Sequence, residues 1–293
     1  MQTGLREAVS YCRDLVRQVS HEEYLIGLLL PRPMHRVTWF GTRALNVELA
    51  GVVTGVINER GKEPAAARLV WWRENLVDMC SGNAAAAHPV MRCLEPAVRG
   101  GGLSRSFLVR LVEARHKEVE RLGAVQFRSV AELEAFGEDV YASLNYLNLH
   151  AAGIKNIEAD HAASHLGKAS FLAKVIRGIP FHASRRQCFL PMDVCAEKRL
   201  SQEELYSGRS SGALSDVVLR LATQGKHHVE HAATIGNVPR EAGPFLLEFV
   251  ALQRFFARLE KQFQFDVMNP AFAGDRDTWL PVRLFLKRKH PFQ

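Results

Sequence analysis

The sequence LGKASFLAKVIRGIPFHASRRQCFLPMD occupies residues 166–193 and is the most informative stretch of the chain. Its first half consists mainly of small and apolar residues at helical spacing. The adjacent Arg185 and Arg186 then form a short basic linker, and Leu190 with Pro191 closes the stretch. This order predicts a helix of small and apolar residues that ends just before a basic linker.

The same helical pattern continues on both sides of this stretch. Near the start of the chain, apolar residues recur with charged residues between them, at Leu5, Val9, Cys12, Leu15, Val16 and Val19. Prolines, glycines and polar turns separate the patterned stretches. We expect helices at residues 5–19, 37–57, 65–79, 87–98, 107–122, 130–149, 159–176, 201–206, 214–233, 239–263 and 279–289. Few runs alternate with a period of two, so strands are not expected.

About ten helices with short connections predict one all-α domain over residues 1–293. The composition agrees, because 47% of the residues are hydrophobic and 24% are charged, which suffices for a sizeable core. The longest apolar runs, such as residues 25–30, are much shorter than the roughly 18–20 residues of a membrane-spanning helix. We therefore do not expect the chain to cross a bilayer.

The net charge of +7 favours an anionic neighbour. An acidic protein face, a lipid surface and RNA all remain open, because charge alone does not distinguish them. The five cysteines are odd in number and form no C-x-x-C pair, which is typical of reduced thiols in an intracellular protein. No transit peptide is evident, since Glu7 and Asp14 depart from the acid-poor composition of such peptides.

Residues 166–193 resemble the second signature segment of squalene and phytoene synthases, which are head-to-head prenyl transferases with an all-α isoprenoid synthase fold. In that family the segment reads roughly N-I-L-R-D-x-x-E-D, followed by a basic stretch and Y-L-P. Arg177 matches the family arginine, and residues 189–191, Phe-Leu-Pro, match the final part. Gly178 and His182 stand where the family has acids. The segment keeps the family framework and loses its carboxylates.

The sequence RALNVELA at residues 43–50 corresponds to the first family motif, R-x-x-D-x-x-x-D. Asn46 and Ala50 occupy its two aspartate positions, and Glu48 cannot replace them because two residues along a helix turn a side chain by roughly 200°. In the family, these aspartates hold the Mg²⁺ ions that bind prenyl diphosphates, and Mg²⁺ requires oxygen ligands. The resemblance therefore implies a chain with no catalytic residues, no metal and no cofactor. An active prenyl transferase is the less favoured alternative.

Four arginines remain at positions where the family approaches diphosphate, namely Arg43, Arg177, Arg185 and Arg186. Arginine binds phosphate oxygens through paired hydrogen bonds, so one interpretation is a vestigial pocket for a phosphate or lipid. The other interpretation is structural, with each arginine holding a helix end through a glutamate or a carbonyl group.

Two histidine patterns point to zinc at first sight. Residues 227–231, HHVEH, fit the H-x-x-E-H pattern of zinc hydrolases. His161 and His165 also lie one helical turn apart. Zinc generally takes four ligands, so neither pattern is complete by itself. We expect ordinary helix faces at both places and no metal site.

The resemblance extends over nearly the whole chain, because LVWWREN at residues 69–75 and HPV at residues 88–90 also match family segments. The sequences RALNVELA, DHAASHLGKA and FLPMDVC most resemble one branch of the family, which also lacks acidic residues at these motifs. Members of that branch assist the assembly of mitochondrial respiratory complex I. This resemblance implies an inactive, prenyl-synthase-like assembly factor on the matrix side of the inner membrane. Its expected partners are complex I subunits or other assembly factors, with a peripheral contact to that membrane. The alternative is the same scaffold in the assembly of another mitochondrial complex, such as the mitoribosome, with contacts to rRNA.

Overall fold

The computed structural model describes residues 2–56, 59–83, 87–121 and 127–292. Within these ranges the chain forms helices and no strand. The helices are α1 (Gln2–Val19), α2 (His21–Leu29), α3 (Pro33–Thr54), η1 (Glu59–Gly61), α4 (Lys62–Cys80), α5 (Pro89–Arg99), α6 (Arg105–Arg121), α7 (Val130–Gly137), η2 (Glu138–Ala142), α8 (Ser143–Ala151), α9 (Ile157–Ala183), α10 (Met192–Glu197), α11 (Gln202–Tyr206), α12 (Gly212–Thr234), η3 (Arg240–Phe245), α13 (Glu248–Lys261), α14 (Pro270–Ala273) and α15 (Leu280–Lys287).

Most of the predicted helices are confirmed, with ends shifted by a few residues. The long apolar helix, α9, continues past the predicted end at residue 176 as far as Ala183 and contains Pro180 in its last turn. The prediction of one helix over residues 239–263 is wrong, because Pro244 lies within the 3₁₀ helix η3 and the α-helix begins again only at α13. Two predicted helix ends, at residues 57 and 122, lie outside the described residues.

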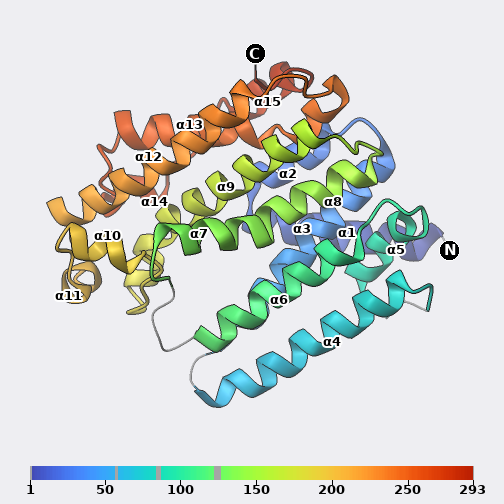
Figure 1. Cartoon of the computed structure of the whole chain (residues 1–293), viewed down its shortest axis with the longest axis horizontal. Coiled ribbons are helices and arrows are strands. Elements are labelled where there is room, and N and C mark those ends of the chain that lie inside the picture. Colours follow the sequence, from blue (N-terminus) through green and yellow to red (C-terminus); the bar gives the residue numbers. More distant parts are fainter. Residues whose placement is uncertain (1, 57–58, 84–86, 122–126, 293) are drawn as a thin grey trace.

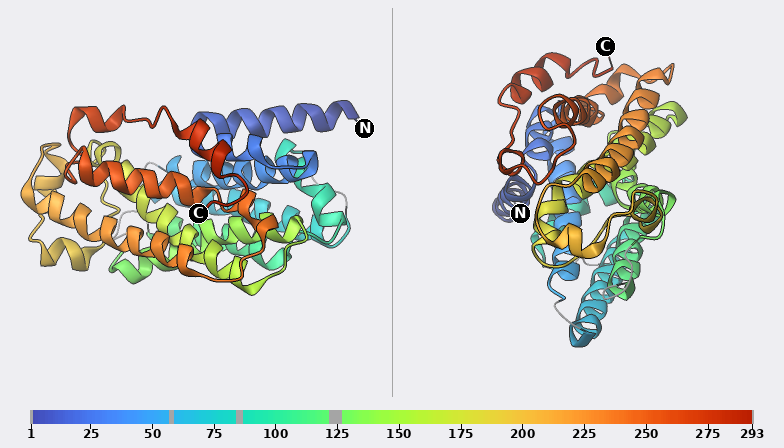
Figure 2. Two further views of the ribbon diagram at one scale, coloured as in Figure 1. Left: turned by 90° about the horizontal axis from the view of Figure 1, so that it is seen from above. Right: turned by 90° about the vertical axis from the view of Figure 1, so that its left-hand side faces the viewer.

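The two motif segments lie on α3 and α9, which are the framework of the molecule. α9 packs against α7, η2, α8, α12 and α13, whereas α3 packs against α1, α5, α6 and α8. In Figure 1, α12 and α13 form one long side, α4 and α6 form the other, and α3, α8 and α9 lie between them. Figure 2 shows that the C-terminal segment, in red, returns to the side of the molecule occupied by α1 and α2. Both helices that carry the motif segments, α3 and α9, therefore lie in the interior of the bundle, and each packs against a different set of helices.

One hydrophobic cluster connects the helices, from Ala8 in α1 to Leu284 in α15. Its closest helix crossing depends on Gly167 of α9. A Cβ atom at this position would lie 2.3 Å from the backbone nitrogen of Ala142 and 2.6 Å from its Cα. Because both are backbone atoms, the crossing of α9 and η2 admits no larger residue without displacement of a helix. Among the described residues, no helix combines the length and apolar character needed to cross a membrane.

Candidate functional site

An ion pair stands between the two motif segments. Arg115, on α6, is buried, and its Nη2 donates to the Oδ1 atom of Asn46 at 2.9 Å. Its Nη1 donates to Oε2 of Glu118, one turn further along α6, at 2.6 Å. Burial alone would lower the pKa of Arg115, but Glu118 and Tyr141 raise it by more, so the guanidinium group is charged. The first motif position thus faces a fixed cation from α6.

In the second motif segment, Gly178 and His182 stand at the positions where the family has acids. His182 packs its ring against Phe189, with 4.3 Å between ring centroids, and its Nδ1 atom lies 3.3 Å from Oε1 of Gln187. Burial lowers the pKa of His182, while the charge of Glu118 acts in the opposite direction. The charge of Glu118 therefore acts on His182 of the second motif segment as well as on Arg115.

A divalent cation has little to bind at this centre. Hard cations such as Mg²⁺ take oxygen ligands, and the two motif helices supply an amide at Asn46, a methyl group at Ala50, no side chain at Gly178 and an imidazole at His182. Across the described ranges, no group of three or more His, Cys, Asp or Glu side chains is arranged to hold a metal ion. Glu118, whose charge acts on His182, is engaged by Arg115.

The four arginines of the proposed phosphate pocket each have a different neighbour. Arg43 is buried, donates to Oδ1 of Asn145 at 2.6 Å and stacks over Trp39. Arg177 pairs with Glu22 at 2.7 Å. The other two lie at the C-terminal end of α9, where Arg185 stacks over Phe181 and Arg186 pairs with Glu203 at 2.6 Å. Arg177 lies within α9, whereas Arg185 and Arg186 follow the end of that helix at Ala183.

Helix α2 supplies the carboxylates that neutralise the cations of α9. Next to the pair of Glu22 and Arg177, Glu23 pairs with Lys174 at 3.1 Å. Burial alone would raise the pKa of Glu23, but Lys174 and Arg43 outweigh it and hold the pKa below its ordinary value. The sequence analysis missed both glutamates because it missed α2. The signal available was Ser20 followed three residues later by Glu23, since Ser20 caps α2 by accepting from the backbone nitrogen of Glu23.

A buried carboxylate on α13 continues this network. Glu248 accepts a hydrogen bond from Ser170 of α9 and another, at 3.2 Å, from Nδ2 of Asn145 on α8. Asn145 in turn accepts from Arg43. Four helices are joined in this way by hydrogen bonds between polar side chains, although Nε and Nη1 of Arg43 are buried without a hydrogen-bond partner among the described residues. Sequence patterns gave no sign of this network, because residues that bond directly to each other are up to 103 positions apart.

The two histidine patterns meet in space. His165 of α9 lies against α12, with its Nδ1 atom 2.9 Å from Nδ1 of His228 and its ring stacked on His231. Nε2 of His228 contacts Oε1 of Glu134, on α7, at 3.0 Å. Burial, followed by the neighbouring histidines, lowers the pKa of His165 to about 4. These polar side chains thus lie at the contact between packed helices. Among the described residues, they do not form a group arranged to hold a metal ion.

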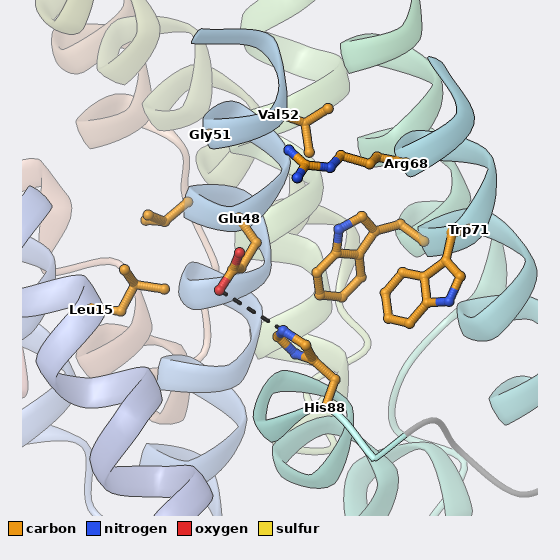
Figure 3. A pocket seen from close by; sticks show the side chains of 9 residues that line it. Leu15, Glu48, Gly51, Val52, Arg68, Trp71 and His88 are labelled. Atoms are coloured by element: carbon orange, nitrogen blue, oxygen red, sulfur yellow. Dashed lines mark ion pairs between the residues drawn. The ribbon is translucent and has the colours of Figure 1, made fainter. Parts of the chain in front are cut away.

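A separate pocket lies on the face of α3 that carries Glu48, which is opposite to the face where Asn46 contacts Arg115. It has a volume of about 520 Å³ and lies between α1, α3, α4 and α5 (Figure 3). The side chain of Glu48 points into it, accepts a hydrogen bond from the hydroxyl group of Tyr11 and lies 4.0 Å from Nε2 of His88. Trp71 and Trp72 form the wall on α4. Glu48 is thus directed away from Asn46, as expected from their separation of two residues.

Comparisons with known proteins agree with this architecture. The family model described as squalene/phytoene synthase matches residues 16–277. Two solved structures of the same fold are a dehydrosqualene synthase in complex with ligand, with a TM-score of 0.78 and 16% identity, and a squalene synthase from Alicyclobacillus acidocaldarius, with a TM-score of 0.73 and 15% identity. The first match covers 97% of this chain and 96% of the other, and the second covers 89% and 96%. The predicted all-α fold similar to isoprenoid synthases is confirmed.

Relatives with higher sequence identity are named as assembly factors, whereas the solved structures are named as synthases. The proteins called NADH dehydrogenase (ubiquinone) complex I, assembly factor 6, from Rattus norvegicus and Homo sapiens are each 35% identical to this chain. The matches cover 97% and 94% of this chain and 83% and 80% of those proteins. A presqualene diphosphate synthase from Rhodopseudomonas palustris is 20% identical over 61% of this chain and 63% of its own length.

Proposed function

This chain belongs to the squalene/phytoene synthase family, and from that membership we propose that it is a non-catalytic member which assists the assembly of mitochondrial respiratory complex I. The observation that carries the proposal is the match of 35% identity over 97% of the chain to a relative named as a complex I assembly factor. We further propose that residues 1–293 form a single domain in the mitochondrion, on the matrix side of the inner membrane, with complex I subunits or other assembly factors as partners.

The geometry between the motif helices supports the absence of catalysis. Ionisation of a prenyl diphosphate needs bound cations that stabilise the leaving group. At the motif positions Asn46, Ala50, Gly178 and His182 there is no carboxylate to bind such a cation. The cations of the chain near this centre already have partners, since Arg115 pairs with Glu118 and Arg177 pairs with Glu22. We therefore propose no catalytic residue, metal or cofactor for this centre.

A direct assay tests this part of the proposal. The purified protein is incubated with farnesyl or geranylgeranyl diphosphate and Mg²⁺, and released diphosphate is measured. We expect no release above a control without protein. Release that depends on both protein and Mg²⁺ would instead establish an active prenyl transferase. A thermal-shift series with the same diphosphates, with and without Mg²⁺, separately tests the vestigial pocket around Arg43, Arg177, Arg185 and Arg186, which a rise in midpoint would support.

The choice of assembly client is tested by affinity purification of the tagged protein from mitochondria, with and without RNase. We expect complex I subunits and other assembly factors to co-purify in both cases. A scaffold for the mitoribosome would instead co-purify with ribosomal proteins that are lost after RNase or high salt, because phosphate contacts weaken steeply with salt. The net charge of +7 is the one observation that favours this alternative.

The peripheral membrane contact has a candidate surface at α15. Leu280 and Leu284 are buried, whereas the opposite third of the helix exposes Trp279, Val282, Phe285 and Leu286. At 100° per residue, Arg283 and Lys287 border this apolar arc on one side and Arg288 borders it on the other. Apolar residues flanked by basic ones suit a helix that lies in the surface of an anionic membrane.

Vesicle sedimentation tests that surface. We expect the protein to sediment with vesicles that contain anionic lipid, and the double variant Phe285→Ser/Leu286→Ser to remain in solution because it loses the apolar arc. Ile157→Ser is the matched control, since Ile157 is exposed on α9 and distant from α15 in sequence. Equal sedimentation of the double variant and the wild type would remove α15 from the proposal.

A further inference from the structure

The pocket on the outer face of α3 has the size and walls of a ligand site. Its volume of about 520 Å³ lies within the range of roughly 300–1,000 Å³ that is usual for small-molecule sites. Leu15, Val47 and Val52 give it an apolar floor, and Trp71 and Trp72 give it an aromatic wall. The two indole rings are almost perpendicular, at 80°, so they enclose a corner. The site is distinct from the centre between the two motifs.

Glu48 gives one side of this pocket a negative charge that lacks a permanent counterion. Among the described residues, the ion-pair partner within 4.0 Å of its carboxylate is His88. The Nδ1 atom of His88 accepts a hydrogen bond from the backbone nitrogen of Val90 at 3.2 Å, so the ring proton resides on Nε2, facing Glu48. Burial lowers the pKa of His88 by more than Glu48 raises it, which keeps the ring neutral near pH 7. The carboxylate is therefore held in place by Tyr11 and His88 without being neutralised.

Arg68 gives the other side of the pocket a positive charge. Its side chain extends from α4 across the pocket toward the turn of α3 that contains Gly51 and Val52 (Figure 3). Glu48 lies one helical turn earlier on α3, a separation of about 6 Å along the axis. The pocket thus presents a positive group near Gly51 and Val52 and a negative group at Glu48, with aromatic rings in the same lining.

Packing does not explain why a glycine stands at position 51 within α3. Glycine within a helix costs up to about 1 kcal/mol relative to alanine, and the buried glycines of this chain offset that cost through close contacts. At Gly167, for example, a Cβ atom would meet backbone atoms. At Gly51, a Cβ atom would meet nothing within 4 Å. The missing side chain leaves space in the wall of the pocket, between the two charges.

We propose that this pocket binds a small zwitterion of the phosphocholine type, with its ammonium group at Glu48 and the indole rings and its phosphate at Arg68. A quaternary or primary ammonium group is attracted both to a carboxylate and to aromatic faces. An arginine fork binds phosphate oxygens. The charges of such a ligand are separated by a few bonds, so one small molecule carries both of the groups that Glu48 and Arg68 would bind. This inference is independent of the assembly role.

Titration of tryptophan fluorescence or calorimetry with phosphocholine tests the site, with choline alone and inorganic phosphate alone as half-ligands. We expect both half-ligands to bind at least about tenfold more weakly than phosphocholine. The neutral isostere 3,3-dimethylbutyl phosphate, in which carbon replaces the ammonium nitrogen, should show the same loss. No binding of phosphocholine by about 10 mM, or equal binding of the isostere, would overturn the proposal.

Two variants separate binding from folding. Glu48→Gln retains an acceptor for Tyr11 and should lower the affinity at least about tenfold. Gly51→Ala should raise the thermal midpoint, because alanine is the better helix former, and lower the affinity by filling the wall. Gly212→Ala on α12, where a Cβ atom also meets nothing, is the matched control that should leave binding unchanged. Wild-type affinity in both pocket variants would overturn the proposal.

The same variants identify the source of the ligand. If the natural ligand is a lipid headgroup, Glu48→Gln should reduce sedimentation with neutral phosphatidylcholine vesicles as well as binding of soluble phosphocholine. If it is a free metabolite, the variant should reduce only the binding of soluble phosphocholine. Either outcome supports the site, and unchanged binding in both assays contradicts it.

Discussion

Asn46, which the sequence resemblance places at an aspartate position of the family, contacts a cation of the protein itself. Its amide accepts a hydrogen bond from Arg115, which also pairs with Glu118. A carboxylate at this position would face a guanidinium group and would be neutralised by it. We therefore propose that Asn46 belongs to a centre built around an arginine and without a metal.

The variant Asn46→Asp should stabilise the protein without creating a magnesium site. A hydrogen bond between the charged Arg115 and a carboxylate is stronger than the present one to a neutral amide, which predicts a gain of about 1 kcal/mol in the free energy of unfolding. Thermal unfolding with and without Mg²⁺ measures the effect, and Ala50→Asp is the control on the same helix face. A midpoint of Asn46→Asp/Ala50→Asp that rises when Mg²⁺ is added would contradict this account.

His165, at the contact of α9 and α12, should make the stability of the protein depend on pH. Its folded-state pKa of about 4 is below the ordinary value of 6.5, so the unfolded chain binds more protons between these values. Stability contributed by this group is therefore present above about pH 6.5 and is lost as the pH falls toward 4. Urea unfolding at several pH values measures the effect. As the pH falls from 6.5 toward 4, the free energy of unfolding should decrease less for His165→Asn than for the wild type. His161→Asn, on the exposed face one turn earlier, should behave as the wild type does.

At the scale of the helices, α9 tolerates substitution very unevenly along its length. Gly167 lies against the backbone of Ala142, whereas Gly178 faces only the flexible side chain of His182. Gly167→Ala should lower the free energy of unfolding by about 1–3 kcal/mol through overpacking. Gly178→Ala should leave it equal or slightly higher, because alanine favours the helix. Equal unfolding midpoints for the two variants in urea would show that the crossing of α9 and η2 is less tight than described.

Sequence patterns predicted these helices well where polar and apolar residues alternate at helical spacing, as in α1 and α12. They failed at α2, whose second half, from Tyr24 to Leu29, is apolar on every side and is followed by Pro31. They also failed at η3, where a proline divides a continuous apolar stretch. In both places the helix boundaries follow from tertiary contacts and capping, which a pattern of hydrophobicity does not record.

For the whole molecule, the sequence suggested the positions that correspond to the family motifs, which stays a prediction, and it did not reveal the residues that contact them. Arg115 is 69 residues from Asn46, and Lys174 belongs to a different helix from Glu23. Such pairs arise only when the bundle is assembled. The pocket at Glu48 escaped the sequence analysis for the same reason, since its walls come from four helices. The family resemblance predicted the fold, whereas the contact of Asn46 with Arg115 is visible only in the structure.

The central claim is that a prenyl-synthase-like fold without catalysis serves the assembly of complex I. The most direct measurement is the amount of each assembled respiratory complex in cells that lack this protein, by native electrophoresis. We expect complex I to be depleted while the other respiratory complexes remain, and re-expression of either the wild type or the Arg177→Gln variant to restore it. Unchanged complex I in cells that lack the protein would contradict the account.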